Sequence, residues 1–307
     1  MGGGFCRGWG ERVMVVAIRG LLAVAMLVLI GGEVGHARAQ ISFGPRPEGG
    51  IVVPYEPTPD NVVDAMLKIG SVGPQDYVID LGSGDGRIVI AAAKKYGAQG
   101  LGVDLNPDLV KRSIANAQSA GVSDRATFRE EDIFKTDLSP ATVITMFLFP
   151  QINLKLRPKL LDLKPGTRIV SHFHDMADWR PDQSQKLQTT EHYGDTWIFL
   201  WYVPAKVEGD WRWTALRGGV MQQHVLTLRQ KFQEVEGSLA TESQRPIDIR
   251  DAKLRGGHLT FWIPIRDGGR TARWDFQGDI DGGTIVGTDG TSDATGRMEQ
   301  AWRATRR

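Results

Sequence analysis

The chain has 307 residues, of which 41% are hydrophobic and 24% charged, a length and composition typical of soluble globular proteins with about two domains. Its 37 lysines and arginines almost balance 36 acidic residues, so the overall charge does not indicate a nucleic-acid or membrane-surface binder. We accordingly expect no nucleic-acid partner. The only cysteine, Cys6, leaves the chain without an internal disulfide.

The first 39 residues have the organisation of a secretory signal peptide. Three arginines precede an uninterrupted apolar run at residues 20–30, and "ARA" at 37–39 supplies small residues around a cleavage point. The run is shorter than the roughly 20 apolar residues that a spanning helix needs. We predict cleavage after Ala39 and a periplasmic or secreted protein. The alternative is an uncleaved segment that anchors a cytosolic protein to the membrane.

Residues 40–54 are rich in glycine and proline and are predicted to be a linker. A helix is expected at about 59–69, with Thr58 as N-cap and Pro59 in the first helical position. Apolar strand segments then alternate with helical ones. Strands are expected at 77–81, 99–105, 126–130, 142–149, 167–173 and 196–203, and helices at 87–96, 107–120 and 153–162.

Strands that are almost continuously Val, Ile and Leu, separated by helices, are typical of a parallel sheet covered on both faces. Residues 55–204 are therefore predicted to form a doubly wound α/β domain. Residues 205–307 lack a helical period and alternate apolar with polar residues between Gly-rich turns. They are predicted to form a small antiparallel β domain, either a barrel or a sandwich, with five tryptophans that are candidates for its core or for a ligand cavity.

The segment "DLGSGDG" at residues 80–86 carries the first chemical signal. Its glycines, Gly82, Gly84 and Gly86, are spaced G-x-G-x-G at the end of the first predicted strand of the sheet, where α/β sheets bind ligands. The spacing differs from the G-x-G-x-x-G of dinucleotide-binding loops. Asp80 would also repel a pyrophosphate and attract a cationic or amino-bearing ligand. NAD is therefore disfavoured.

This motif is similar to the glycine motif of class I S-adenosylmethionine-dependent methyltransferases, which have a Rossmann-like sheet. Two further acids fit that resemblance: Asp104 ends the second predicted strand, and Asp132 follows the third. The resemblance implies that Asp104 binds the ribose hydroxyls and that Asp132 binds the adenine amino group. The implied cofactor, S-adenosylmethionine, would be held by Asp80, Gly82, Ser83, Gly84, Gly86, Asp104, Leu105, Asp132 and Ile133. Taken singly, each acid could equally be a solvated cap of a helix.

Longer segments resemble a narrower group. "PYEPTPDNVVDAML", "GVDLNP" and "LKPGTRIVSHFHDMADW" are similar to non-SET protein-lysine methyltransferases that modify the c-subunit of ATP synthase and the adenine nucleotide translocase. The likeness covers about residues 52–203. It implies that the segment before the first helix closes over the cofactor and involves Tyr55, Glu56 and Thr58. The alternative for these three residues is a helix cap and an entry turn.

Methyl transfer from a sulfonium requires mainly that an acceptor is aligned with the S–CH3 bond and left deprotonated. Carbonyl oxygens after the fourth strand commonly hold an amine acceptor in such enzymes, and here that loop is "LFPQIN". Phe149, Pro150 and Gln151 are therefore the acceptor-side candidates, unless they form only a buried turn. The loop lacks the N/D-P-P-Y pattern of DNA-adenine and glutamine methyltransferases, which disfavours those two activities. The resemblance to the lysine methyltransferases implies that the acceptor is a protein lysine or another amine, and that membrane-associated proteins are among the candidate partners.

His172 and His174 would share one face of a strand, with Asp175 next to them, which is a possible metal site. Two histidines and one carboxylate are too few for a metal prediction, and a histidine hydrogen-bonded within the fold is the preferred interpretation. No metal is predicted.

Two functions remain open from the sequence. The first is a methyltransferase whose β domain presents or recruits the acceptor, favoured by the intact set of acids and glycines. The second is an exported binding or envelope-interaction protein that keeps a methyltransferase-like scaffold, since fold alone does not establish activity. The predicted export favours the second, because S-adenosylmethionine is made in the cytosol.

Overall fold

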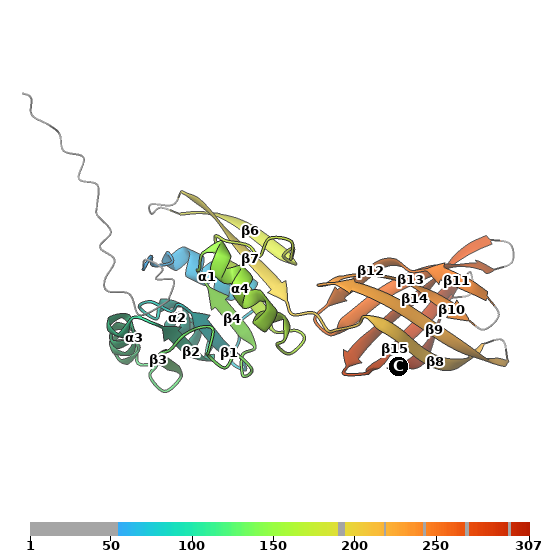
Figure 1. Ribbon diagram of the computed structural model, residues 1–307, viewed down its shortest axis with the longest axis horizontal. Helices are drawn as coiled ribbons and strands as arrows, with labels where there is room; N and C mark the ends of the chain where they lie inside the picture. Colours follow the sequence, from blue (N-terminus) through green and yellow to red (C-terminus); the bar gives the residue numbers. More distant parts are fainter. Residues whose placement is uncertain (1–54, 190–193, 218, 242–243, 268–269, 294–295) are drawn as a thin grey trace, which may run out of the picture. The chain divides into compact units, whose positions relative to one another are not determined.

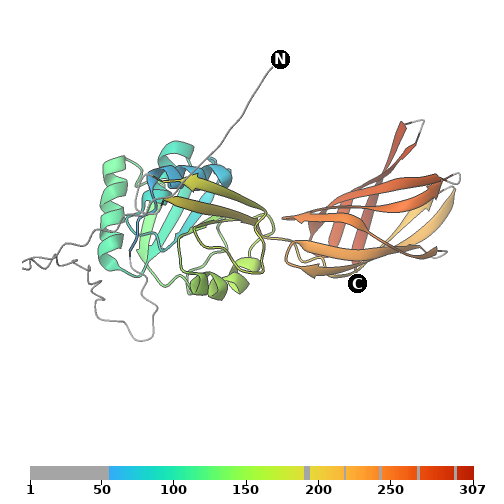
Figure 2. The same ribbon diagram turned by 90° about the horizontal axis from the view of Figure 1, so that it is seen from above.

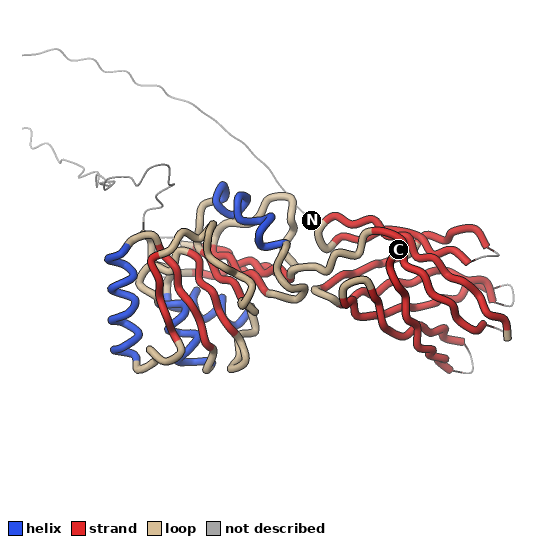
Figure 3. The backbone as a smooth tube through the Cα atoms, turned by 60° about the horizontal axis from the view of Figure 1, so that its bottom comes forward, coloured by secondary structure: helices blue, strands red, loops and turns tan. Residues whose placement is uncertain are grey.

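The computed structural model describes residues 55–189, 194–217, 219–241, 244–267, 270–293 and 296–307, so the predicted signal peptide and linker lie outside the described residues. The described chain contains a seven-stranded sheet with four helices and a nine-stranded sheet made of strands alone (Figures 1 and 3). The predicted fold class is confirmed. No helix in these residues is both long and apolar enough to cross a membrane.

The seven-stranded sheet contains β1 (Tyr77–Leu81), β2 (Gln99–Asp104), β3 (Ala126–Glu130), β4 (Val143–Met146), β5 (Arg168–His172), β6 (Gln183–Gln188) and β7 (Asp195–Tyr202). Its strand order is β3-β2-β1-β4-β5-β7-β6. Strands β1 to β5 are parallel, whereas β7 is antiparallel to β5 and to β6. The order of the strands reverses between β1 and β4, which is where doubly wound sheets bind their ligands.

Helices cover both faces of this sheet, as Figure 2 shows. They are α1 (Asp60–Ile69), α2 (Arg87–Tyr96), α3 (Pro107–Ala120) and α4 (Pro150–Leu161). The buried residues of α1 and α2 pack with one set of strand side chains, and those of α4 pack with the opposite set. Because strand residues point alternately to the two faces, Val78 contacts the first group and Ile79 the second, and neither is exposed to solvent.

Several predicted boundaries differ from the structure. The N-cap of α1 is Pro59 and not Thr58, whose hydroxyl lies 3.3 Å from Nδ1 of His172 instead. The predicted strand at 142–149 ends at Met146, and α4 begins at Pro150, because a proline fits the first turn of a helix. Strand β6 was not predicted, since its sequence "QSQKLQ" is polar and largely exposed.

The nine-stranded sheet is antiparallel, as predicted for the C-terminal region. It contains β8 (Gly209–Arg217), β9 (Val220–Lys231), β10 (Glu234–Thr241), β11 (Gln244–Asp248), β12 (Arg250–Arg255), β13 (His258–Asp267), β14 (Arg270–Asp281), β15 (Thr284–Asp293) and β16 (Gly296–Arg306). Its order, β11-β10-β9-β8-β16-β15-β14-β13-β12, makes its two edge strands consecutive in the chain. Ile249 lies between these edges and donates its N–H to Gly237 of β10 at 3.0 Å, so the sheet nearly closes on itself.

The interior of this sheet is filled with large aromatic side chains. Trp211, Trp213, Trp274 and Trp302 are each at most 9% exposed and belong to one apolar cluster. The rings of Trp213, Trp274 and Trp302 all contact Phe276, and the ring centroids of Trp213 and Trp302 are 4.9 Å apart. These four tryptophans therefore form a packed core.

The predicted domain boundary between residues 204 and 205 falls between the last strand of the first sheet and the first strand of the second. Residues 203–208, which join β7 to β8, belong to neither a helix nor a strand. Val203 packs into the apolar core on the α4 side of the first sheet, whereas Val207 packs into the tryptophan cluster of the second. The two ends of this short connection thus contribute side chains to two separate apolar cores.

Candidate functional site

The glycine loop between β1 and α2 is held tightly by the neighbouring strand. The N–H groups of Gly82 and Ser83 both donate to the carbonyl of Val103 in β2 at 2.9 Å. Gly82, Gly84 and Gly86 all have positive φ angles, of 78°, 55° and 83°, which favour glycine. A Cβ atom on Gly84 would lie 2.4 Å from the ring of Tyr55. The loop therefore packs closely against that ring.

Asp80 lies at the end of β1 with only 2% of its surface exposed. Burial is the main cause that raises the pKa of Asp80 to about 7, with smaller contributions in the same direction from the charges of Asp104 and Asp85. The hydroxyl of Thr145 opposes that shift by donating a hydrogen bond of 2.7 Å to Asp80 Oδ1. A cationic group next to Asp80 would favour its ionised form.

Asp104, at the end of β2, organises the neighbouring backbone. Its Oδ2 accepts from the N–H of Gly84 and its Oδ1 accepts from the N–H of Asn106, each at 2.9 Å. Asp104 therefore joins the glycine loop to the start of α3. Leu105 beside it is 51% exposed, which leaves an apolar surface at this edge of the sheet.

Asp132 follows β3 and closes a short turn by accepting a hydrogen bond of 2.9 Å from the N–H of Phe134. Ile133 is half-buried and packs against the apolar core on the α4 side of the sheet. Ser83 is 5% exposed, and its hydroxyl has no hydrogen-bond partner among the described residues. The loop thus keeps one buried polar group available for a ligand.

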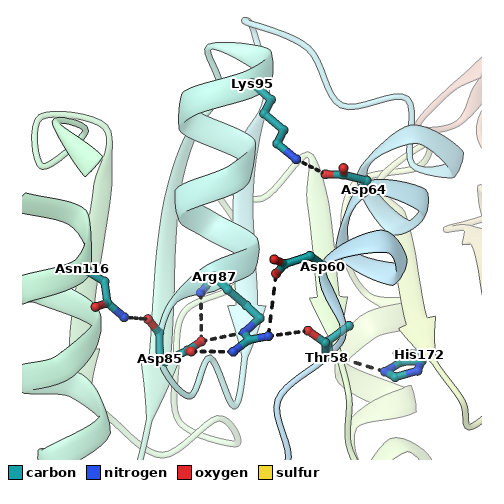
Figure 4. A network of polar contacts seen from close by, with 8 residues as sticks. All are labelled: Thr58, Asp60, Asp64, Asp85, Arg87, Lys95, Asn116 and His172. Carbon is teal, nitrogen blue, oxygen red and sulfur yellow. Dashed lines mark hydrogen bonds and ion pairs between the residues drawn. The ribbon is translucent and has the colours of Figure 1, made fainter. Parts of the chain in front are cut away.

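Residues 55–58 are fastened to the glycine loop by a network centred on Arg87, shown in Figure 4. The guanidinium group of Arg87 makes two hydrogen bonds, of 3.0 and 2.8 Å, to the carboxylate of Asp85, and a third of 2.8 Å to the carbonyl of Thr58. Tyr55 also hydrogen-bonds to Asp85, and burial is the first cause that raises the pKa of Tyr55. These contacts hold Tyr55 and Thr58 at the loop, whereas Glu56 is simply exposed.

Sequence patterns alone do not identify Asp85 and Arg87 as part of the site. They occupy positions that no motif specifies, and only the fold brings residues 55–58 within their reach. Thr145 was missed for the same reason, because it hydrogen-bonds to Asp80 from the neighbouring strand β4. A polar residue inside the otherwise apolar segment "VITMFLF" was the one signal that could have identified it.

The acceptor-side candidates lie where β4 ends and α4 begins. Phe149 is 41% exposed, and its carbonyl accepts the first helical hydrogen bonds, from Ile152 at 2.9 Å and Asn153 at 3.1 Å. Pro150 and Gln151 form the exposed first turn of α4. This loop reaches the glycine loop through Leu148, which would lie 3.1 Å from a Cβ atom on Gly82.

The two histidines do not share a strand face. β5 ends at His172, which is buried with its ring nitrogens 3.3 Å from the hydroxyl of Thr58 and 3.0 Å from that of Thr196. Burial is the first cause that lowers the pKa of His172 to about 4, so its imidazole is neutral at pH 7. His174 lies beyond the strand and is half-buried. Within the described ranges, no three potential ligands are grouped to hold a metal.

The arrangement fits a cofactor that carries a cation and a ribose. Carboxylates lie at or after the ends of three adjacent strands, with Asp80 closest to the order reversal, and hydroxyl donors suit the free lone pairs of Asp104. The exposed backbone of a glycine loop permits the close approach of such a molecule. The unpaired Ser83 hydroxyl adds a further polar contact. The residues present are thus chemically suited to S-adenosylmethionine.

Part of the chain is similar in sequence to known methyltransferases. A family model described as the ANTKMT methyltransferase domain matches residues 80–183. A protein-lysine N-methyltransferase of Saccharolobus islandicus is 45% identical over 138 residues, which cover 44% of this chain and 86% of that protein. The mouse lysine N-methyltransferase of the ATP synthase c-subunit is 34% identical over 152 residues, which cover 48% of this chain and 58% of that protein.

A solved structure is also similar to part of the chain. It is an RNA methyltransferase from Salinibacter ruber in complex with S-adenosyl-L-homocysteine, with 48% sequence identity and a TM-score of 0.46, and the match covers 50% of this chain and 96% of that one. The chain thus spans most of the archaeal relative but little more than half of the mouse relative.

Proposed function

Because the chain belongs to the protein-lysine N-methyltransferases, we propose that its α/β unit transfers the methyl group of S-adenosylmethionine to the side-chain amine of a protein lysine. The observation that carries this proposal is the set of acids at one edge of the sheet, around a glycine loop that is covered by Tyr55. The exported scaffold without activity is the less favoured function, since burial disfavours the charged form of an acid such as Asp80 and a scaffold without a ligand gains nothing from keeping it.

We assign the binding roles as follows. Asp104 accepts hydrogen bonds from the ribose hydroxyls, and Asp132 and Ile133 contact the adenine ring. The glycine loop with Ser83 lies against the amino-acid portion, whose ammonium group favours the ionised form of Asp80. The remaining cofactor contacts are assigned to Tyr55, Glu56, Thr58 and Leu105. Tyr55 and Thr58 exclude water from the loop, a role supported by their contacts with Gly84 and Arg87.

When bound, the cofactor supplies a methyl group that is already activated on a sulfonium. The protein therefore has only to orient a neutral amine in line with that group. The lone pair of the lysine nitrogen forms the new N–C bond while the C–S bond breaks, and the nitrogen then loses its proton to solvent. We assign the orientation of the amine to the loop of Phe149, Pro150 and Gln151, which contacts the glycine loop through Leu148.

The acceptor protein is a separate part of the proposal. The relatives named above are a protein-lysine methyltransferase and a lysine methyltransferase of the ATP synthase c-subunit. We infer that the partner here is also a protein with an accessible lysine, and that it is membrane-associated. The nine-stranded sheet is proposed to recruit it.

Methyl transfer can be tested directly with the full chain. The protein would be incubated with S-adenosylmethionine carrying a deuterated methyl group, a lysine-containing peptide array and, separately, total RNA, with products identified by mass spectrometry. We expect label on lysine, lost in Asp104→Ala and retained in Asp108→Ala, a matched aspartate that is 86% exposed. Label on RNA alone, or transfer that survives Asp104→Ala, would contradict the proposal.

We also propose that residues 1–39 export the protein, with a membrane-anchored cytosolic form as the alternative. The support is the charged, apolar and small-residue order of that segment. Fusions of residues 1–54 to alkaline phosphatase, which is active only outside the cytosol, and to a cytosol-active reporter would test it. Activity of the cytosolic reporter alone would refute export.

A further inference from the structure

Two aromatic side chains at the edge of the sheet are exposed where most of their neighbours are buried. Phe149 follows β4 and is 41% exposed, and Phe173 follows β5 and is 44% exposed. Both rings approach the imidazole of His174, with centroid distances of 6.2 Å from Phe149 and 4.8 Å from Phe173. The three rings form a cluster that we call the aromatic rim.

The backbone that carries Phe173 is strained and firmly held. Its φ angle is +68°, a left-handed conformation that costs a bulky residue about 1–2 kcal/mol. Its N–H donates a hydrogen bond of 2.7 Å to the carbonyl of Trp197. The carbonyl of the following residue, His174, accepts hydrogen bonds from the hydroxyl of Ser171 at 2.6 Å and from the side-chain amide of Asn153 at 3.3 Å.

Ser171 and Asn153 are both fully buried, so two interior polar groups fix a loop whose phenylalanine side chain is exposed. A loop needed only to connect two strands would relieve the strain with glycine at position 173. Strain that is maintained by its surroundings in this way is concentrated at functional sites. The geometry therefore indicates that the exposed ring of Phe173 has a functional role at the surface.

The aromatic rim lies beside the glycine loop, on the side away from most of the acids. β4 is the neighbour of β1, and β5 is the neighbour of β4. Asp104 ends β2 and Asp132 follows β3, and these two strands lie on the other side of β1. Leu148, next to Phe149, contacts the glycine loop. A molecule that enters over the rim would thus reach the loop from the side opposite to the proposed adenosine contacts.

We propose that Phe149, Phe173 and His174 bind the side chain of the acceptor lysine, a proposal that rests on the lysine methyl transfer proposed above. The faces of the two phenyl rings pack against the four methylene groups, and their π electrons attract the ammonium group before it loses its proton. The imidazole completes the aromatic surface between them. The rings take no part in bond making, which occurs at the lysine nitrogen.

The charge state of His174 suits this role. Burial is the first cause that lowers the pKa of His174, against a smaller opposing influence from the carboxylate of Asp175. The imidazole is therefore neutral at pH 7 and does not repel a lysine ammonium group. The exposed carboxylate of Asp175 provides a weak attraction for the same cation.

The test uses a lysine side chain alone, so that it does not depend on the identity of the acceptor protein. The full chain, labelled with 4-fluorophenylalanine and saturated with S-adenosylhomocysteine, would be titrated with millimolar Nα-acetyl-lysine methylamide and followed by ¹⁹F NMR. Phe149→Leu and Phe173→Leu would assign the two signals. The norleucine analogue, which has the same carbon chain without the nitrogen, is the matched ligand control.

We expect saturable shifts of both signals with the lysine compound and much smaller ones with the norleucine compound. Phe173→Ala should weaken lysine binding, read from the Phe149 signal, by about tenfold, the equivalent of one cation–π contact. Phe173→Tyr should restore the binding, and Leu154→Ala, a change of a 38% exposed residue on α4, should leave it intact.

Signals that do not move, or that move equally with both compounds, would overturn the assignment of the aromatic rim. S-adenosylhomocysteine affinity, measured on the same variants, should be unchanged. Because methyl transfer to peptides is scored in a separate assay, the two failures are distinguishable. Transfer to lysine with unresponsive rings refutes only the rim, whereas rings that bind lysine in a chain that transfers no methyl group refute the proposed function.

Discussion

At the scale of single residues, Asp80 makes the stability of the protein depend on pH. The native pKa of Asp80 is about 7 and its ordinary value is 3.8, so the native state binds more protons than the unfolded state between these values. Linkage then requires the free energy of unfolding to fall as pH rises through this interval. The stability contributed by the protonated form is complete at acidic pH and is lost near pH 7.

Asp80→Asn should remove this dependence, because the amide keeps an acceptor for Thr145 without carrying a charge. We expect the variant to gain about 2–3 kcal/mol relative to the wild type between pH 5 and pH 8, following 1.36 kcal/mol per pKa unit. Urea unfolding at the two pH values measures the difference. An equal effect of the substitution at both would show that Asp80 titrates normally in the folded protein.

At the scale of elements, Arg87 connects the start of α2 to the segment that precedes α1. Arg87→Lys preserves the charge but loses the planar fork that bonds Asp85 twice and the carbonyl of Thr58 once. Faster amide hydrogen exchange is expected around residues 58–63, together with weaker S-adenosylhomocysteine binding.

The matched control for that change is Lys95→Met, which breaks the half-exposed ion pair with Asp64 shown in Figure 4. Such pairs contribute about 0–1 kcal/mol, so neither exchange nor cofactor affinity should change appreciably. If both variants behaved alike, the network around Arg87 would have no special part in holding residues 55–58.

The elements that the sequence predicted well are those with a strong local signal. Helices α2 and α3 have the predicted bounds because glycine ends each of them in a left-handed conformation. Strand β6 was not predicted because an edge strand that is largely exposed needs no apolar alternation. The N-cap of α1 was assigned to Thr58 on local preference, but its hydroxyl is used in a contact with His172, 114 residues away.

The same distinction applies to the candidate site. The glycines and acids were predictable because a strand end, a tight turn and a carboxylate occur together in short segments of the sequence. Asp85, Arg87 and Thr145 were not, because their partners are contributed by other elements and their spacing carries no motif. Phe173 was not predicted to be a site residue, since a left-handed φ angle in a phenylalanine has no sequence signature.

At the scale of the whole molecule, the nine-stranded sheet contains a buried carboxylate, that of Asp289, which depends on a basic side chain for its counter-charge. The side chain of Asp289 has no exposed surface; it forms an ion pair with Arg217 and accepts a hydrogen bond of 2.8 Å from Trp274 Nε1. Asp289→Leu should destabilise the protein by about 3 kcal/mol, because Arg217 loses its counter-charge.

The double variant Arg217→Met with Asp289→Leu should recover most of that loss, since no unpaired charge remains when both members of the pair are replaced by apolar residues. Thermal unfolding followed by near-ultraviolet circular dichroism, which reports the packing of the tryptophans, measures both variants. Cofactor affinity should be the same in each. If the double variant were as unstable as the single one, the destabilisation would come from lost packing instead of the unpaired charge.

The acids around the glycine loop are proposed to bind S-adenosylmethionine. Isothermal titration of residues 40–307 with S-adenosylmethionine and S-adenosylhomocysteine tests it most directly. We expect micromolar binding of both, abolished by Asp104→Ala because the ribose hydroxyls and the N–H of Gly84 lose their common acceptor. The absence of binding in a folded sample, or unchanged affinity in the variant, would contradict it.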